Sequence, residues 1–269
     1  MTEPVVGQSR RLGPPLLLGG LLLLAWEVYA RSSGISPFVL PAPSQVLGSL
    51  WDFRGEAVRH AIPTIVETAA GFAAAIVAAT AVAVLLDRVP WARRAVEPYL
   101  VGSQTIPIVA IAPLVVVWFG FGLVPKVLIV VIVTFFPITI ALLDGFASTP
   151  AAATELMRSL GASDAETFRK VRWPSGLPGF FTGLRIAATY AVVAAVIGEY
   201  VGATDGLGIW MQLSLRSFRT DLVFAAIIVT AILSIALYGA VVVAERAVIP
   251  WWAASRTTAR LPERPSTSG

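Results

Sequence analysis

Long apolar runs separated by short polar stretches dominate the pattern of this 269-residue chain. A helix needs about 20 residues to cross roughly 30 Å of hydrocarbon. Six runs come close to that length or exceed it, at residues 14–30, 62–86, 98–119, 126–146, 179–201 and 222–244. Because lipid-exposed backbone must satisfy its own hydrogen bonds, and the runs lack the alternation of a barrel, helices are favoured. The pattern predicts an all-α integral membrane protein with about six transmembrane helices.

Composition supports a membrane protein and excludes several other classes. Charged residues make up 13% of the chain and the mean hydropathy is +0.79, whereas soluble domains carry about 25% charged residues. The absence of cysteine excludes disulfides and thiolate metal sites. The basic residues are dispersed among loops and form no stripe for nucleic acid. A signal peptide over residues 14–30 is disfavoured, because Trp26 and Tyr29 stand where a small-residue cleavage site would be expected.

The distribution of cations predicts the topology. If the N-terminus is cytoplasmic, thirteen cations lie inside and six outside. The inside set is Arg10, Arg11, Arg88, Arg93, Arg94, Arg158, Arg169, Lys170, Arg172, Arg246, Arg256, Arg260 and Arg264; the outside set is Arg31, Arg54, Arg59, Lys126, Arg216 and Arg219. The positive-inside rule therefore predicts a multi-pass protein of the cell membrane with both termini in the cytoplasm.

Three regions follow from this topology. Residues 1–13 are expected to form a cytoplasmic N-tail, and residues 14–249 a six-helix membrane domain. Residues 250–269 are expected to form a cytoplasmic C-tail, disordered because its Pro, Ser, Thr and Arg cannot bury enough apolar surface. Upstream of the second run, three prolines precede residues 44–51, which predicts an extended connector leading into a short amphipathic helix at the outer surface.

The cytoplasmic loop at residues 147–178 has a helix-turn-helix pattern. Ser148, Thr149 and Pro150 resemble a helix start, after which Leu156, Met157 and Leu160 share one face and Gly161 suits a left-handed helix end. A capping box at Ser163 and Glu166 opens a second short helix carrying Phe168 and Val171, which Pro174 and Pro178 are expected to stop. These residues alone leave two interpretations open: a hairpin lying on lipid head groups, or an element that docks onto a cytoplasmic partner.

The spacing of Glu155, Gly161, Val171 and Pro174 resembles the cytoplasmic loop of binding-protein-dependent ABC importer permeases. The two alanines that follow the glutamate in that family are Leu156 and Met157 here. The resemblance extends over residues 38–250, through residues 40–44, 183–185 and 198–208, and is greatest to the nitrate, sulfonate and taurine branch. It implies a type I ABC importer permease fold that moves a small organic solute into the cytoplasm by alternating access.

By that resemblance, the loop holds a coupling helix seated in a cleft of a separate ATP-hydrolysing subunit. The implied contact residues are Glu155, Leu156, Met157, Arg158, Gly161, Ala162, Phe168 and Pro174. The chain has no Walker A motif, so no cofactor, metal or catalytic residue is expected on it, and ATP and Mg are expected on the partner. The implied partners are a cytoplasmic dimer of ATP-binding subunits, an extracellular or periplasmic substrate-binding protein, a second permease copy in a homodimer, and the lipid bilayer.

Polar residues within the spans are candidates for the solute pathway, because a charge at mid-bilayer costs a few kcal/mol unless it is sheltered. The candidates are Glu67, Gln104, Thr105, Trp118 and Glu199, although Glu199 could instead pair with a neighbouring helix. Three prolines, Pro107, Pro113 and Pro137, are expected to break the third and fourth spans and free carbonyls for the solute.

The resemblance also bears on the solute. Permeases for anions often carry arginine at the position of Glu67, so the glutamate favours a neutral or cationic organic solute. The run from Ser103 to Pro113 looks like that of permeases for thiamine-precursor pyrimidines or riboflavin.

Glycines recur every four residues in or beside the fifth run, at Gly179 and Gly183 and at Gly198, Gly202 and Gly206. Small residues at this interval allow close helix packing. The glycines could serve packing within one subunit or contact between two subunits, and the sequence leaves both roles open.

Two other classes of protein are less well supported. An integral membrane enzyme would need a nucleophile with a base or a metal cluster, but the single histidine, His60, lies at an outer edge and no nucleophile-elbow or paired-histidine motif occurs. A secondary carrier or channel remains the alternative transport function, but it gives no reason for the cytoplasmic helix-turn-helix.

Overall fold

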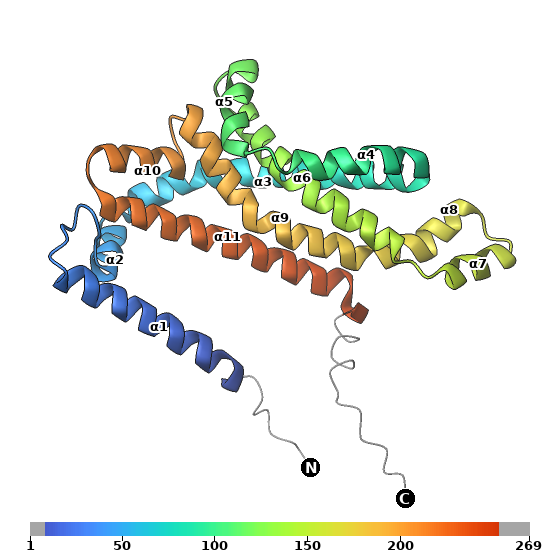
Figure 1. Ribbon diagram of the computed structural model, residues 1–269, viewed down its shortest axis with the longest axis horizontal. Helices are drawn as coiled ribbons and strands as arrows, with labels where there is room; N and C mark the ends of the chain where they lie inside the picture. The colour runs from blue at the N-terminus through green and yellow to red at the C-terminus, as the bar shows by residue number, and fades with distance from the viewer. Residues whose placement is uncertain (1–8, 253–269) are drawn as a thin grey trace, which may run out of the picture.

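The computed structural model describes residues 9–252, which are helical apart from turns and short connectors (Figure 1). Residues 1–8 and 253–269, which hold most of the predicted N-tail and the predicted disordered C-tail, lie outside the described residues. The helices are α1 Ser9–Ser32, α2 Pro43–Asp52, α3 Arg54–Arg88, α4 Pro90–Ser103, α5 Ile108–Phe119, α6 Leu123–Ala147, α7 Ala151–Ser159, α8 Asp164–Thr167, a π-helical turn Phe168–Arg172, α9 Trp173–Gly202, α10 Leu207–Arg216 and α11 Thr220–Val248.

Five helical segments within residues 9–252 are long and apolar enough to cross a membrane: Gly13–Ser32, Arg54–Arg88, Leu123–Ala147, Asp164–Gly202 and Thr220–Val248. Helices α4 and α5 taken together are also long and apolar enough to cross a membrane, but they are bent by 100° at the break between them. The described part of the chain therefore has five or six candidate spans, in agreement with the predicted fold class.

The third predicted span is not one continuous helix. It is interrupted before Pro107, which has extended backbone with φ −62° and ψ 120°. Proline has no N–H for the helical ladder and disfavours helical geometry in the preceding residue, so the chain turns here. In contrast, Pro113 and Pro137 lie inside α5 and α6, which continue through them, so the breaks predicted at these two prolines were wrong. Prolines are tolerated within membrane helices because neighbouring groups take up the freed carbonyls.

Helices α6 and α9 form the centre of the molecule, with α3 and α11 packed on them (Figure 1). Glycines allow α6 and α9 to approach with backbone against backbone. A Cβ added at Gly179 would lie 2.4 Å from the Ala141 carbonyl oxygen, and one added at Gly145 would lie 2.7 Å from the Gly176 oxygen. Gly183 and Gly198 likewise face α6 of the same chain. The four-residue glycine spacing thus serves packing within one subunit.

Replacing Gly179 by alanine should force α6 and α9 apart, because the new methyl group would meet backbone atoms that cannot rotate away. We expect a loss of about 1–3 kcal/mol in unfolding free energy, as for other overpacked cores, measured by thermal unfolding in detergent. Gly239→Ala in α11 is the matched control, since a Cβ at Gly239 has no atom within 4 Å. Equal unfolding temperatures for the two variants would contradict the close-packing argument.

The N-terminal region lies to one side of this core. The apolar window of α1 has no buried residue. Near its end α1 contacts the rest of the molecule through hydrogen bonds from Ser44 to Glu27 and through the Trp26 ring, 5.4 Å from Phe224 of α11 between centroids. The short helix predicted before the second span is α2, which buries Val46. The following helix begins at Arg54, eight residues before the predicted start at residue 62, so α3 extends well beyond the apolar run.

Candidate functional site

Helix α7 has no buried residue and stands at one end of the molecule, next to α8 (Figure 1). Glu155 is exposed, and Leu156 is 61% exposed. The helix ends as predicted at Gly161, which has φ +79°. The Ala162 N–H donates to the Met157 carbonyl at 3.0 Å and the Gly161 N–H to the Arg158 carbonyl at 2.9 Å, which is the pair of bonds of a Schellman motif. Local capping, rather than burial, therefore sets the shape of α7.

The second helix begins with the predicted capping box. The Ser163 N–H donates to the Glu166 carboxylate at 3.0 Å, and the Glu166 N–H donates to the Ser163 hydroxyl at 3.3 Å. This helix does not stop at Pro174 or Pro178, so that prediction was wrong. It continues through the π-helical turn into α9, and the Trp173 N–H donates to the Phe168 carbonyl five residues earlier. The wider turn shifts the bonding register just before Pro174, in the first turn of α9, where a missing donor costs little.

The predicted coupling residues separate into two groups. The first lies on α7 and the turn after it, at Glu155, Leu156, Met157, Arg158, Gly161 and Ala162. The second comprises Phe168 and Pro174, which are half-buried against the membrane helices. The Phe168 ring lies 5.6 Å from Phe146 and 6.3 Å from Trp173, measured between centroids. In the first group Glu155, Leu156, Arg158 and Gly161 are exposed, whereas Met157 and Ala162 are half-buried like the second group.

A cavity of about 750 Å³ lies between the α4–α5 break, α6 and α9. Gln104 and Thr105 line it, together with Phe136 and Tyr190. Trp118 is 68% exposed and does not line this cavity. Sequence reasoning thus found two of the polar wall residues but not the aromatic ones, which only the packing of α6 and α9 brings to the wall.

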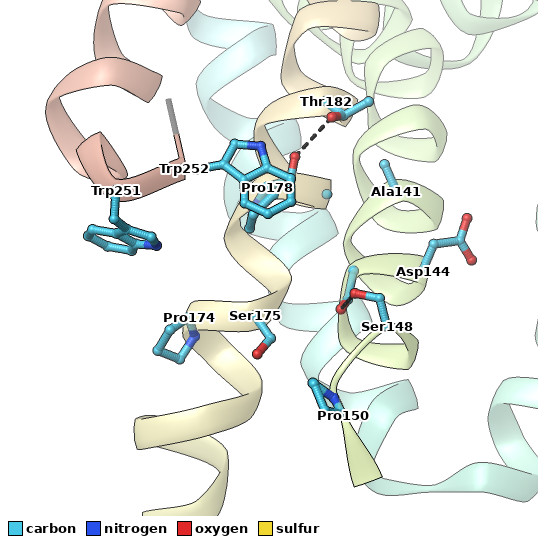
Figure 2. A pocket seen from close by; sticks show the side chains of 12 residues that line it. Ala141, Asp144, Ser148, Pro150, Pro174, Ser175, Pro178, Thr182, Trp251 and Trp252 are labelled. Carbon is cyan, nitrogen blue, oxygen red and sulfur yellow. Dashed lines mark hydrogen bonds between the residues drawn. The ribbon is translucent and has the colours of Figure 1, made fainter. Parts of the chain in front are cut away.

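A second cavity, of about 800 Å³, lies along α6 and α9 on the side toward α7 (Figure 2). Pro174, Ser175 and Pro178 come from α9, and Asp144 and Ser148 come from the end of α6 (Figure 2). The two cavities share Ala141, Asp144 and Thr182 in their walls. They are therefore neighbours on one face of the α6–α9 pair.

Glu67 is paired inside the protein. The Lys126 ammonium donates to the Glu67 carboxylate at 2.6 Å, and the two residues are 8% and 2% exposed. Lys126 was counted above with the cations of an outer loop, which is wrong, because it lies in α6 with its charge on the interior. Since Lys126 balances Glu67, the charge of Glu67 does not by itself indicate the charge of the solute. Neither cavity has Glu67 in its wall.

Glu199 is fully buried and holds the start of α10. The Thr64 hydroxyl donates to one carboxylate oxygen at 2.5 Å, and the Gly208 N–H donates to the other at 2.5 Å. The Leu207 N–H donates to the Thr64 hydroxyl at 3.0 Å. The first N–H groups of a helix lack partners within it and favour negative charge. Glu199 thus has the pairing role that the sequence left open, and it lines neither cavity.

His60 belongs to the same cluster. Its Nδ1 accepts a hydrogen bond from the Gly206 N–H at 3.2 Å, and its ring stacks on Trp210 with centroids 6.0 Å apart. Gly206 has φ +130°, and a Cβ there would lie 2.3 Å from the Glu199 carboxyl carbon. Neither α10 nor this cluster was predicted from the sequence. The glycine-rich stretch after Glu199 was the available signal, because glycines allow the backbone to pack closely against another group, here the Glu199 side chain.

The family model for binding-protein-dependent transport system inner membrane components matches residues 70–250. The formylaminopyrimidine transport permease protein ThiX of Halalkalibacterium halodurans is 37% identical over 238 residues, which cover 88% of this chain and 95% of that protein. The riboflavin transport system permease protein RibX of Chloroflexus aurantiacus is 34% identical over 89% of this chain and 90% of its own length. The taurine transport system permease protein TauC of Escherichia coli is 31% identical, with 86% of each chain covered.

Solved structures show the same fold at lower identity. A chain of an amino acid ABC transporter superposes with a TM-score of 0.61 and 14% identity, covering 74% of this chain and 97% of the other. A chain of the MetNI methionine ABC transporter superposes with a TM-score of 0.51 and 19% identity, covering 72% and 96%. These matches support the importer permease fold.

Proposed function

Because the chain belongs to the binding-protein-dependent transport system inner membrane components, as the permease subunit of an ABC importer, we propose that α7 is its coupling helix. The exposure of α7 is the observation that carries this proposal, since none of its nine residues is buried. Isolated helices this short are marginal in water, so a partner surface that covers Leu156 and Glu155 would stabilise it. The chain itself is a transport subunit and not an enzyme.

The proposed partner is a dimer of ATP-binding subunits that carries ATP and Mg on the cytoplasmic side. The cation distribution supports this placement of α7 and of both termini. With Lys126 removed from the outer count, thirteen cations remain on the proposed inner side and five on the outer side. A substrate-binding protein would deliver the solute from the opposite side, where α2 and α10 lie (Figure 1).

We propose that the two cavities along α6 and α9 form one wall of the solute pathway, with Gln104 and Thr105 as contact residues. A second copy of the chain in a homodimer would supply the facing wall. Gly179, Gly183 and Gly198 of α9 already face α6 within the subunit, so we expect this dimer to form on another surface. Glu67, Trp118 and Glu199 line neither cavity, and a pathway role for them stays a prediction without support from the cavity walls.

For the solute we propose a small hydrogen-bonding heterocycle. Two relatives are named for formylaminopyrimidine and riboflavin, and the cavity at the α4–α5 break combines the rings of Phe136 and Tyr190 with the amide of Gln104. Binding sites for flat organic molecules typically combine apolar walls with a few polar groups. An oxoanion bound by the cognate substrate-binding protein would contradict this choice. Because one relative is named for taurine, a sulfonate, binding of taurine should be measured beside binding of the heterocycles.

The coupling proposal is tested by co-expression with candidate ATP-binding subunits from the same genome. We expect the two subunits to purify together, and Leu156→Asp to weaken the complex about 100-fold, because a carboxylate buried in the contact without a partner costs several kcal/mol. The isolated variant should unfold at the parent temperature, since Leu156 is exposed. Failure of the parent to bind any ATP-binding subunit, or full binding by Leu156→Asp, would refute the proposal.

A further inference from the structure

Two consecutive residues at the end of α3 hold the segment that follows α7. The Arg172 guanidinium donates to the Asp87 carboxylate at 2.6 Å, and the Asp87 side chain is only 4% exposed. Next to it, the Arg88 guanidinium lies 5.5 Å from the centre of the Phe168 ring, within the range of a cation–π contact. The π-helical turn Phe168–Arg172 is thus attached to α3 at both of its ends.

This attachment matters because α7 has few other ways to act on the membrane helices. It buries none of its own residues. Backward along the chain it joins α6 through residues 148–150, and forward it joins α9 through α8 and the π-helical turn. The contact of Asp87 with Arg172 adds α3, a helix distant in sequence, to the elements that a displacement of α7 would reach.

The other end of α3 lies in the buried cluster that fixes α10. His60 and Thr64 accept hydrogen bonds from the N–H groups at the start of α10, and Thr64 also donates to Glu199 of α9. Thr64 and Asp87 are 23 residues apart in one helix, which is about 35 Å at 1.5 Å per residue. One continuous helix therefore connects the contact beside α7 with the contacts of α10 at the far end of the molecule (Figure 1).

We propose that Asp87 and Arg172 are positioning residues that transmit movement of the coupling helix through α3 to α10 and the end of α9. The inference rests on the proposed function, because it needs an ATP-binding subunit that moves α7. If the Asp87–Arg172 ion pair only stabilised the fold, its loss would weaken assembly of the transporter. If the ion pair transmits movement, its loss would reduce the conformational change that ATP produces at α10. Proximity alone does not show coupling, so the decisive measurement must follow the far end itself.

The test uses the complete transporter in lipid vesicles, with a fluorescent dye on a cysteine introduced at Leu215. The chain has no cysteine of its own, and Leu215 lies on α10 with 61% exposure. With the cysteines of the ATP-binding subunits replaced, the dye labels this one surface site in each permease copy. In the parent, ATP with vanadate should change the dye emission. In Asp87→Asn and in Arg172→Gln we expect co-purification and ATP hydrolysis to persist while the emission change falls about five-fold or more.

The exchange Asp87→Arg with Arg172→Asp should restore the emission change, because it rebuilds the ion pair in the reverse sense. Glu97→Gln is the matched control: it removes an acid paired with Arg93 at 3.3 Å in the neighbouring α4, and it should leave the emission change intact. A full signal in either single variant, loss of assembly in both, or an assembled exchange variant without signal would overturn the inference. Absence of any ATP-binding subunit from the parent preparation would instead refute the proposed function.

Discussion

Replacing Lys126 by methionine should lower the free energy of unfolding by about 3–5 kcal/mol, the usual cost of removing one partner of a buried ion pair. Lys126 and Glu67 are both buried, and the second oxygen of the Glu67 carboxylate has no hydrogen-bond partner within the described residues. Without the ammonium, the carboxylate would have to stay charged in an apolar interior or take up a proton. Denaturant or thermal unfolding of the purified permease in detergent measures the loss.

The double variant Glu67→Gln with Lys126→Met provides the control for this prediction. It removes both charges, and replacing a buried ion pair by neutral groups of similar volume is often neutral or stabilising. We therefore expect the double variant to unfold closer to the parent than Lys126→Met does. A double variant no more stable than the single one would contradict the argument that the unpaired Glu67 charge causes the loss.

Replacing Glu155 by arginine should abolish ATP-driven uptake while leaving the permease folded. Glu155 is exposed on α7 and its carboxylate forms no ion pair within the described residues, so the isolated chain loses nothing by the change. In the proposed contact with the ATP-binding subunit, an arginine would be desolvated beside groups arranged for a carboxylate. A cost of about 3 kcal/mol corresponds to roughly a 100-fold weaker contact. Uptake of the cognate solute into vesicles is the measurement.

Glu155→Gln separates charge from shape in this experiment. It keeps the size and a hydrogen-bond acceptor, so we expect a smaller loss of uptake than with arginine. The unfolding temperature of both isolated variants should match the parent. Unimpaired uptake in Glu155→Arg would remove α7 as the coupling element, whereas equal loss in both variants would point to the charge as the essential feature.

Much of the candidate site could be predicted because its signals are local. The left-handed Gly161 and the Ser163–Glu166 capping box concern bonds among residues a few positions apart, and both were found in the structure. The error at Pro174 has the same origin. Proline rules assume a regular α-helix, and the π-helical turn before Pro174 changes the bonding register that those rules presuppose.

The pairing of intramembrane charges could not be predicted from the sequence. Glu67 and Lys126 are 59 positions apart, and Thr64 and Glu199 are 135 apart. Composition says that such charges must be sheltered, but it does not say by which partner. Lys126 illustrates the point, since its position at the start of an apolar run is equally compatible with an outer loop and with the interior.

The sequence by itself determined that this chain is a helical membrane protein, where most of its spans run, and which loop carries the coupling pattern. These properties depend on the transfer of apolar side chains from water and on hydrogen bonds among residues close in sequence. Both can be recognised from short segments of the chain. The tertiary structure alone decided the bend between α4 and α5, the use of the α9 glycines against α6, and the contacts of α3 with both the π-helical turn and α10. These depend on which distant helices meet, because a buried polar group is stable only with the partner that packing brings to it.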